Sequence, residues 1–380
     1  MVEATTSAND SRAHTLLAAY ERAGYTRVAP AILQPAEPFL DLSGEDIRHR
    51  LYLTVDAQGR EFCLRPDLTI PVVRDYLAST QAGQAANLCY LGPVFRQWGE
   101  TAGEFLQAGI ESFGRTDKAA ADAEMLALAL EATAHFGLAR PEIRMGDVGL
   151  FSALIAALKL APAWQRRLIK HFNHKSSLAH DLERLALSGT NARPEYQGVL
   201  AALAGSEPKA ARALVTDLLS IAGITAVGGR SVAEIADRFL EQAALGASIS
   251  LPAATLALIN RFLAIRGDPD HALSELGALA ADAKIDLEPA LDLFESRTGF
   301  LAAHGIDVAH IRFATALGRG FDYYTGVVFE LHDPSGRADS QLVAGGRYDG
   351  LLSQLGAASP IPAVGLAIWI EQLAAAGGGR

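Results

Sequence analysis

The sequence lacks several features that would assign a protein to a class at once. Its 380 residues include only two cysteines, Cys63 and Cys89, which lie far apart, a pattern typical of a reducing cytoplasm. No apolar run reaches the roughly 18 residues of a membrane span, and residues 1–12 are too polar for a signal peptide. Positive charge is also scarce, since the formal net charge is −10. This sign disfavours a general polyanion binder and leaves room only for a local basic patch.

Apolar residues, in contrast, are plentiful. They make up 50% of the chain, which is enough to bury a large core and to form two or so domains. Residues 151–304 are rich in alanine and predict almost continuous helix, with strand-like segments on both sides. His171 and His174 share one helix face there, but they have no third ligand nearby in the sequence. We therefore expect neither a metal nor a cofactor.

The most informative stretch lies near the C-terminal end. Residues 325–331 are β-branched and aromatic and predict a strand, residues 333–336 predict a turn, and residues 340–344 predict an antiparallel return strand. Gly345 and Gly346 follow and allow close approach of another group to the backbone. The strand ends bring charged and phenolic side chains to one rim, among them Arg319, Tyr323, Tyr324 and Tyr348. A surface hairpin with polar ends is one interpretation; a site for a small zwitterionic ligand is the other.

Two motifs in this stretch carry a family resemblance. Arg319-Gly-Phe-Asp-Tyr-Tyr and Ala344-Gly-Gly-Arg-Tyr-Asp-Gly-Leu resemble the two histidine-specific signatures of histidyl-tRNA synthetases, which are class II aminoacyl-tRNA synthetases. The same signatures are similar to those of a non-catalytic relative, the regulatory subunits of ATP phosphoribosyltransferase, the first enzyme of histidine biosynthesis. The resemblance therefore implies one of these two families.

Three further segments resemble the class II motifs. Residues 24–33, with Pro30, are similar to the dimerisation motif, residues 88–114 to motif 2 and residues 361–373 to motif 3. The resemblance implies an α+β fold, with a class II synthetase-like antiparallel sheet flanked by helices and a helical insertion. We expect residues 1–155 to form the first part of this core, residues 156–295 the mostly helical insertion and residues 296–380 the second part, without an anticodon-binding domain.

The resemblance also implies a histidine-binding pocket. Asp67 and Thr69 match the acid and the threonine that hold the α-ammonium group, and a carboxylate with a hydroxyl suits that group. Arg96 matches the arginine that contacts the α-phosphate and the amino-acid carboxylate. Gln107 and Glu111 alternate along one predicted strand and so face the same side. The remaining expected pocket residues are Arg319, Tyr323, Tyr324 and Tyr348. Thr69 alone is equally well read as a helix N-cap, and the whole set as a polar network inside a sheet.

The nucleotide half of the synthetase site departs from the family pattern. Gln372 stands where the synthetases have the arginine that binds the ATP γ-phosphate, and a neutral amide cannot supply that charge. Trp369 replaces the small glycine beneath the adenine, so that its indole would fill the site. The loop between Arg96 and Gln107 is short and carries Trp98 where the family has a glutamate.

These departures favour the non-catalytic relative. We expect a cytoplasmic regulatory subunit that binds L-histidine but not tRNA and forms a homodimer around Pro30. It would assemble with the ATP phosphoribosyltransferase catalytic subunit into a hetero-oligomer, activate it and contribute to feedback inhibition. An active histidyl-tRNA synthetase, or another ATP-dependent histidine-activating enzyme, is the alternative. A free-standing amino-acid-binding protein is a third interpretation.

Overall fold

The computed structural model of the chain divides into two compact units. The larger consists of Met1–Ala153 and Arg261–Arg380, and the smaller of Leu154–Asn260. The helical insertion was predicted at residues 156–295, but the smaller unit ends at Asn260. The helices after residue 268 instead pack within the larger unit. The structure describes residues 2–42, 47–97, 103–187, 208–221, 226–227, 230–231, 252–318, 323–335 and 341–378.

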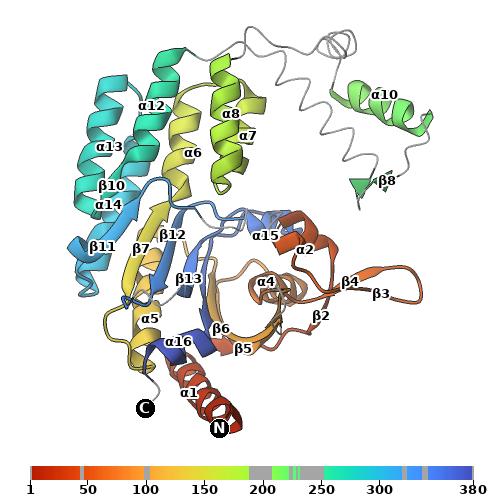
Figure 1. Cartoon of the computed structure of the whole chain (residues 1–380), viewed down its shortest axis with the longest axis vertical. Helices are drawn as coiled ribbons and strands as arrows, with labels where there is room; N and C mark the ends of the chain where they lie inside the picture. The colour runs from red at the N-terminus through yellow and green to blue at the C-terminus, as the bar shows by residue number, and fades with distance from the viewer. Residues whose placement is uncertain are drawn as a thin grey trace. The chain divides into compact units, whose positions relative to one another are not determined.

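A mixed sheet forms the centre of the larger unit (Figure 1). In the described part of the chain its neighbouring strands are, in order, β1 (Thr26–Arg27), β5 (Ala86–Phe95), β6 (Glu104–Phe113), β14 (Ala363–Trp369), β13 (Gln341–Arg347), β12 (Val327–His332), β7 (Glu142–Asp147), β11 (Ile311–Ala314) and β10 (Arg266–Gly267). Most pairs are antiparallel, as expected, but β1 pairs with β5 and β11 with β7 in parallel. In this order the C-terminal strands β14, β13 and β12 lie between the N-terminal strands β6 and β7.

A small sheet and two helices accompany the strands of the first 80 residues. The sheet consists of β2 (Leu33–Pro35), β4 (Glu61–Leu64) and β3 (Leu53–Val55), and the helices are α2 (Glu37–Leu42) and α4 (Thr69–Ala78). Tyr76 of α4 packs against Phe113 of β6 with the ring centroids 4.7 Å apart. Helix α4 therefore covers the face of the large sheet toward which Phe113 points, and Glu111 points the same way.

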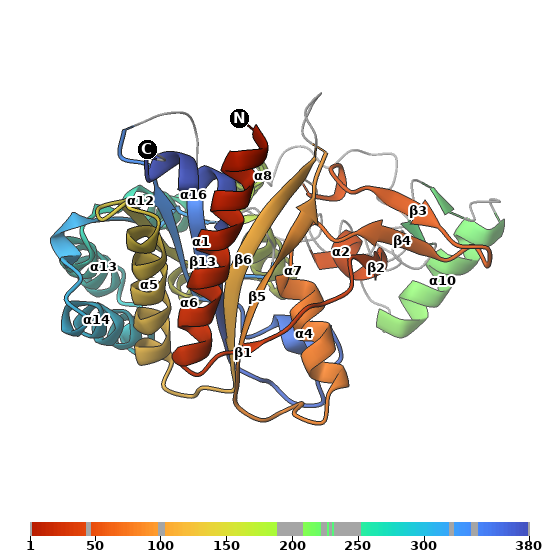
Figure 2. The same cartoon turned by 90° about the horizontal axis from the view of Figure 1, so that it is seen from below.

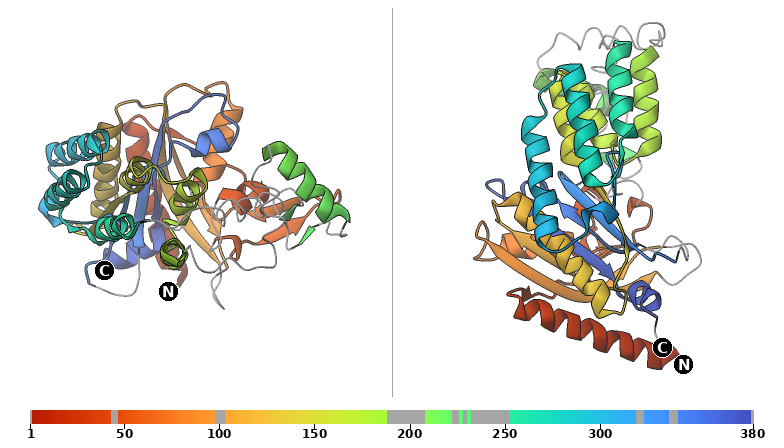
Figure 3. Two further views of the ribbon diagram at one scale, coloured as in Figure 1. Left: turned by 90° about the horizontal axis from the view of Figure 1, so that it is seen from above. Right: turned by 90° about the vertical axis from the view of Figure 1, so that its left-hand side faces the viewer.

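Helices cover the opposite face of the large sheet. They include α1 (Val2–Arg22), α5 (Lys118–His135), α13 (Pro269–Ala283), α14 (Glu288–Ala303) and α16 (Ile370–Ala376). Figure 2 shows α1 and α5 alongside the strands, and α16 lies beside α1 although the two helices come from opposite ends of the chain (Figure 3). The buried residues of α5 are mostly alanine, a strong helix former that lets the helix lie close to the sheet. Gly137, with φ of 88°, terminates α5 in a left-handed turn.

The smaller unit is mostly helical, as the alanine-rich sequence predicted. Its described elements, including two helices that it shares with the larger unit, are α6 (Val148–Ala157), α7 (Pro162–His171), α8 (Lys175–Leu187), α10 (Pro208–Ile221), β8 (Ala226–Val227), β9 (Arg230–Ser231) and α12 (Ala253–Ala264). The buried Asp181 accepts hydrogen bonds from Arg167 at 2.8 Å and His171 at 2.6 Å, so these groups join α7 to α8. The remaining short elements of the larger unit are η2 (Val308–His310) and α15 (Leu351–Gln354). None of the helices described has the length and apolarity needed to cross a membrane.

Candidate functional site

A pocket with about 330 Å³ of empty space opens over the centre of the large sheet. Eight of the nine residues that sequence analysis assigned to a histidine pocket line it: Asp67, Thr69, Arg96, Gln107, Glu111, Tyr323, Tyr324 and Tyr348. The ninth, Arg319, lies outside the described residues, as does Trp98. Gly365, Leu366, Ala367 and Trp369 of β14 complete the lining. The fold thus brings together residues that are about 300 positions apart in the sequence.

The floor of the pocket is formed by residues that pair across the strands β6, β14 and β13. Glu111 of β6 lies directly opposite Gly365 of β14, and Gln107 lies opposite Trp369. Both pairs face the same side because residues four apart on a strand share a face. The next strand continues this face, since Gly346 of β13 is the partner of Gly365.

Glu111 is the most enclosed charged residue of the pocket. Its side chain has no solvent exposure, and its carboxylate accepts hydrogen bonds from the hydroxyls of Tyr348 and Tyr90, the latter at 3.1 Å. Burial raises the pKa of Glu111 to about 7, while the hydroxyls of Tyr348, Thr69 and Tyr90 act against the shift. A buried carboxyl that titrates near neutrality can accept a hydrogen bond from a ring N–H.

Tyr90 is a site residue that sequence analysis missed. Its buried hydroxyl also lies 3.4 Å from the carbonyl oxygen of Leu366, and so it ties β5 to the carboxylate of β6 and to the backbone of β14. The alternation of residues along β5 was a signal for it, because Tyr90 faces the same side as Leu88, the strand partner of Glu111. The pairing of β5 with β6 was expected from motif 2, but their register was not.

Asp67 supplies a second buried carboxylate. Its Oδ1 accepts a hydrogen bond from the backbone N–H of Ile70 at 3.2 Å, and its Oδ2 has no hydrogen-bond partner within the described residues. Burial raises the pKa of Asp67, and the positive charge of Arg96 opposes this. An unpaired buried oxygen is costly unless something occupies the position in front of it. A ligand ammonium group meets that need.

Thr69 is not an N-cap. The N-cap residue of α4 is Leu68, and the hydroxyl of Thr69 is hydrogen bonded toward Glu111 and Tyr90. The backbone N–H of Leu68 donates to the side chain of Gln107 at 3.2 Å, which fixes the start of α4 against β6. The structure therefore favours the pocket interpretation of Thr69 over the capping one.

Arg96 is the one cation among the described pocket-lining residues. Its Nε donates to the carbonyl oxygen of Pro66 at 2.8 Å, and its guanidinium carbon lies 5.6 Å from the ring centroid of Phe105. These contacts hold a largely buried positive charge beside the pocket. Elsewhere in the lining, the rings of Tyr323, Tyr324 and Tyr348 pack together with centroids 4.9–6.4 Å apart.

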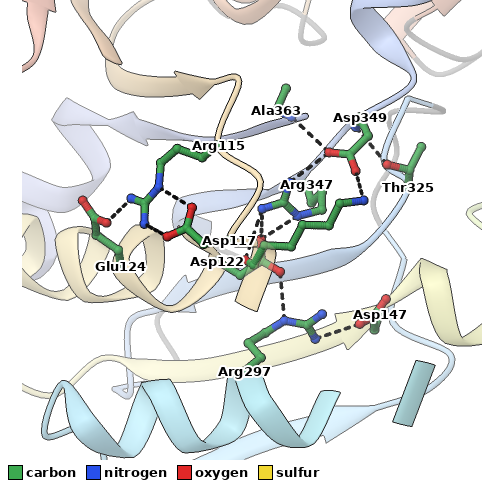
Figure 4. A network of polar contacts seen from close by, with 11 residues as sticks. Arg115, Asp117, Asp122, Glu124, Asp147, Arg297, Thr325, Arg347, Asp349 and Ala363 are labelled. Atoms are coloured by element: carbon green, nitrogen blue, oxygen red, sulfur yellow. Dashed lines mark hydrogen bonds and ion pairs between the residues drawn. The ribbon is translucent and has the colours of Figure 1, made fainter. Parts of the chain in front are cut away.

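A charged network on the opposite face of the sheet supports the tyrosine side of the pocket (Figure 4). Arg347, the neighbour of Tyr348, donates to Asp122 of α5 at 2.8 Å and to Asp349 at 2.9 Å. Arg297 of α14 donates to the other oxygen of Asp122 at 3.0 Å and to Asp147 of β7 at 2.7 Å. Alternation along one strand end thus directs Tyr348 into the pocket and Arg347 into the network.

Comparison with known proteins agrees with these features. A family model described as histidyl-tRNA synthetase matches residues 1–230 and 212–373. The ATP phosphoribosyltransferase regulatory subunits of Brucella ovis and Brucella canis are each 44% identical over 351 residues, which cover 91% of this chain and 92% of theirs. The chain belongs to the family of ATP phosphoribosyltransferase regulatory subunits. Membership in this family of synthetase-like regulatory subunits confirms the sequence-based prediction of a regulatory subunit.

Solved structures with a similar fold include a protein described as a regulatory subunit or synthetase and a histidyl-tRNA synthetase. One, described as an ATP phosphoribosyltransferase regulatory subunit/histidyl-tRNA synthetase from Bacillus halodurans, has a TM-score of 0.65 and 22% identity, covering 100% of this chain and 80% of that one. Histidyl-tRNA synthetase from Nostoc sp. PCC 7120 has a TM-score of 0.61 and 18% identity, covering 97% of this chain and 71% of that one. These likenesses confirm the predicted class II synthetase-like fold.

The two residues taken from the nucleotide half have different positions in this family member. Trp369 is nearly buried and lines the same pocket as the residues predicted to bind histidine. Gln372 is exposed on α16 and is not among the residues that line the pocket. The neighbouring Glu371 accepts a hydrogen bond from the backbone N–H of Leu106 at 2.8 Å. The indole therefore occupies the floor of the pocket, whereas the amide faces solvent.

Proposed function

We propose that this regulatory subunit binds free L-histidine in the pocket over β6, β13 and β14. The observation that carries the proposal is the pair of buried carboxylates, Asp67 and Glu111, that line one small cavity with Arg96. Such a set of charges suits a ligand with an ammonium group, a carboxylate and a ring that donates a hydrogen bond. Histidine has all three.

The proposed pose follows the chemistry of the lining. Asp67 and Thr69 hold the α-ammonium group, and Arg96 holds the carboxylate, with Arg319 on the same side. Glu111 and Tyr348 face the imidazole, and Gln107, Tyr323 and Tyr324 form the rest of the wall. The unpaired Oδ2 of Asp67 supports the position of the ammonium group.

We further propose that the chain does not activate histidine or bind tRNA. Support comes from Trp369, which lines the pocket together with the residues proposed to bind histidine, and from the neutral, exposed Gln372. The function of the chain would instead be to activate the ATP phosphoribosyltransferase catalytic subunit and to help transmit inhibition by histidine. The two free, buried cysteines are consistent with the predicted cytoplasmic location.

The assembly is proposed to contain a homodimer around Pro30. Beside this residue, Ile32 and Leu33 expose 44% and 49% of their surface, and Leu53 and Val55 on the adjoining small sheet expose 54% and 60%. Exposed apolar side chains mark an interaction surface; in the small sheet Leu53 and Val55 share one face, and Leu33 lies on the other. A second copy of the chain would cover them.

Calorimetric titration tests the histidine site. Wild type is expected to bind L-histidine, and Glu111→Ala to bind it about ten- to a hundredfold more weakly, because one charged hydrogen bond is lost. Glu295→Ala, which removes an exposed glutamate of α14, is the matched control and should bind as wild type does. Unchanged affinity in Glu111→Ala would place the histidine site elsewhere.

A second experiment tests the regulatory role. The catalytic subunit is captured from lysate with the tagged chain, and its phosphoribosyltransferase activity is measured with and without the chain and with and without histidine. We expect activity to rise with the chain and to fall again on addition of histidine. Activity that does not depend on the chain would contradict the proposal.

A further inference from the structure

Gly365 lies directly beneath the carboxylate of Glu111. The two residues are cross-strand partners on β14 and β6. A Cβ atom at position 365 would overlap Oε2 of Glu111 and would lie 2.7 Å from its carboxyl carbon and 2.8 Å from the carbonyl oxygen of Ile110. Real Cβ atoms do not come this close to other atoms, so the carboxylate can lie flat on the sheet only because position 365 has no side chain.

Each oxygen of the Glu111 carboxylate accepts a hydrogen bond. Tyr348 donates to its Oε2 and Tyr90 donates to its Oε1. The hydroxyl of Tyr90 itself has room only because Gly109 has no side chain, since a Cβ there would overlap the phenol. Gly109 and Gly365 thus create the space in which the carboxylate and its two donors fit.

A third glycine extends this arrangement to the tyrosine wall. A Cβ atom at Gly346 would lie 2.9 Å from Cε1 of Tyr324 and would also meet the backbone of Val327. Gly346 is the strand partner of Gly365, so the two glycines leave adjacent hollows in the floor. One hollow receives the carboxylate, and the other receives a ring of the wall.

We propose that Gly365 is a specificity-determining residue, which selects a ligand ring bearing an N–H by fixing the height of the Glu111 carboxylate above the sheet. The proposal rests on the proposed histidine site. With any larger residue at 365, the carboxylate must rise toward the ligand and leave Tyr348, or turn away from the pocket. Either movement removes the acceptor from the plane in which a ring N–H can reach it.

The test compares two ligands that differ only in the ring. L-Histidine carries a ring N–H, and 3-(2-thienyl)-L-alanine has a five-membered ring of similar size without one. We expect Gly365→Ala to weaken histidine binding about ten- to a hundredfold, while the affinity for thienylalanine changes less than about threefold. Gly299→Ala is the matched control, because its new methyl group has open space in α14 and should leave both affinities unchanged. Equal losses for both ligands, or an unchanged histidine affinity, would overturn the proposal.

A double variant separates placement of the carboxylate from general damage to the pocket. In Glu111→Gln, the charge that Gly365 positions is already gone, so adding Gly365→Ala should weaken histidine binding only about threefold or less further. Losses that multiply would show that Gly365 acts independently of Glu111 and would contradict the proposal.

A measurement without ligand keeps this inference distinct from the histidine proposal. Carbon-13 NMR of glutamate carboxyl groups should reveal one that titrates near pH 7 and disappears in Glu111→Gln. Gly365→Ala should move its midpoint by about half a pH unit or more, since the carboxylate changes its donors and its solvation. If wild type binds no histidine but the midpoint moves, the histidine site fails and the positioning role of Gly365 stands. A midpoint that does not move would overturn the role of Gly365.

Discussion

At the scale of single residues, Glu111 combines full burial with partners that carry no charge. Its hydroxyl donors oppose the rise in pKa but do not cancel it, because removal from water disfavours the ionised form more strongly. A carboxyl whose pKa is higher in the folded protein than in the unfolded chain keeps its proton up to a higher pH in the folded protein. The free energy of unfolding must therefore depend on pH between the two pKa values.

The sign of this dependence gives the first prediction. As pH rises from the usual value of 4.5 through about 7, the unfolded chain loses the proton first and the folded protein loses stability. Glu111→Gln lacks this titration, so its unfolding free energy relative to wild type should increase by about 3 kcal/mol between pH 5 and pH 8 without ligand. Urea unfolding at several pH values checks this. A difference that does not vary with pH would mean that Glu111 stays ionised throughout.

Asp67 gives a second prediction at this scale. Asp67→Asn replaces the carboxylate by an amide of the same shape that cannot neutralise an ammonium group. Histidine binding should weaken about ten- to a hundredfold. Imidazole propionate, which lacks the ammonium group, should bind wild type and Asp67→Asn with affinities within about threefold. Calorimetry measures both ligands, and an equal loss for both would assign Asp67 to the structure of the pocket only.

At the scale of elements, the charged network joins two helices to two strands. Arg297 is almost fully buried and is hydrogen bonded to both Asp122 and Asp147, which come from α5 and β7. Removing one member of a buried pair leaves an uncompensated charge. The network therefore secures α14 to the sheet more strongly than an exposed ion pair could.

A matched pair of variants tests this difference. Arg297→Met should lower the free energy of unfolding by about 3–5 kcal/mol. Arg312→Met removes an arginine that is 71% exposed and pairs with Glu142, and it should cost less than about 1 kcal/mol. Urea unfolding of the two variants and wild type measures both changes. Similar values for the two variants would mean that burial does not decide the contribution of these pairs.

Elements also show how far the sequence could predict this structure. The strands predicted at residues 325–331 and 340–344 correspond to β12 and β13, because strand and turn patterns act over a few residues. Arg297 lies just after the predicted insertion, in a stretch for which the sequence predicted only helix, yet its partners are 150 and 175 residues away. Tyr90 was missed for the same reason: alternation shows which way a residue faces, but not which strand lies beside it.

The residues that line the pocket were largely predictable, because most of them belong to recognisable sequence motifs. The eight predicted residues that the structure describes all line one cavity. Of the glycines that shape its floor, Gly346 was singled out from the sequence, but Gly109 and Gly365 were not, since their role depends on which side chain lies opposite them. Gly365 acquires its meaning only from its register with Glu111.

At the scale of the whole molecule, the exposed apolar residues near Pro30 predict self-association. Leu33→Asp and Val55→Asp should convert the proposed dimer into a monomer at micromolar concentration, because a charge would be buried without a partner. Phe300→Asp, at a residue of α14 with 44% exposure, is the control and should remain dimeric. Light scattering distinguishes the species. A wild-type monomer, or dimers for all variants, would exclude this surface as the dimer interface.

The strand order of the large sheet has a consequence for how the chain is made. Strands β6 and β7 end by residue 147, but β14, β13 and β12, which separate them, come from residues 327–369. A ribosome that adds about 5–20 residues per second needs roughly ten seconds to a minute to deliver the missing strands. During that interval the nascent chain carries two strand edges whose final partners do not yet exist, and such edges are prone to pair with other chains. The ligand pocket lies over those late strands, so it is among the last parts of the molecule to form.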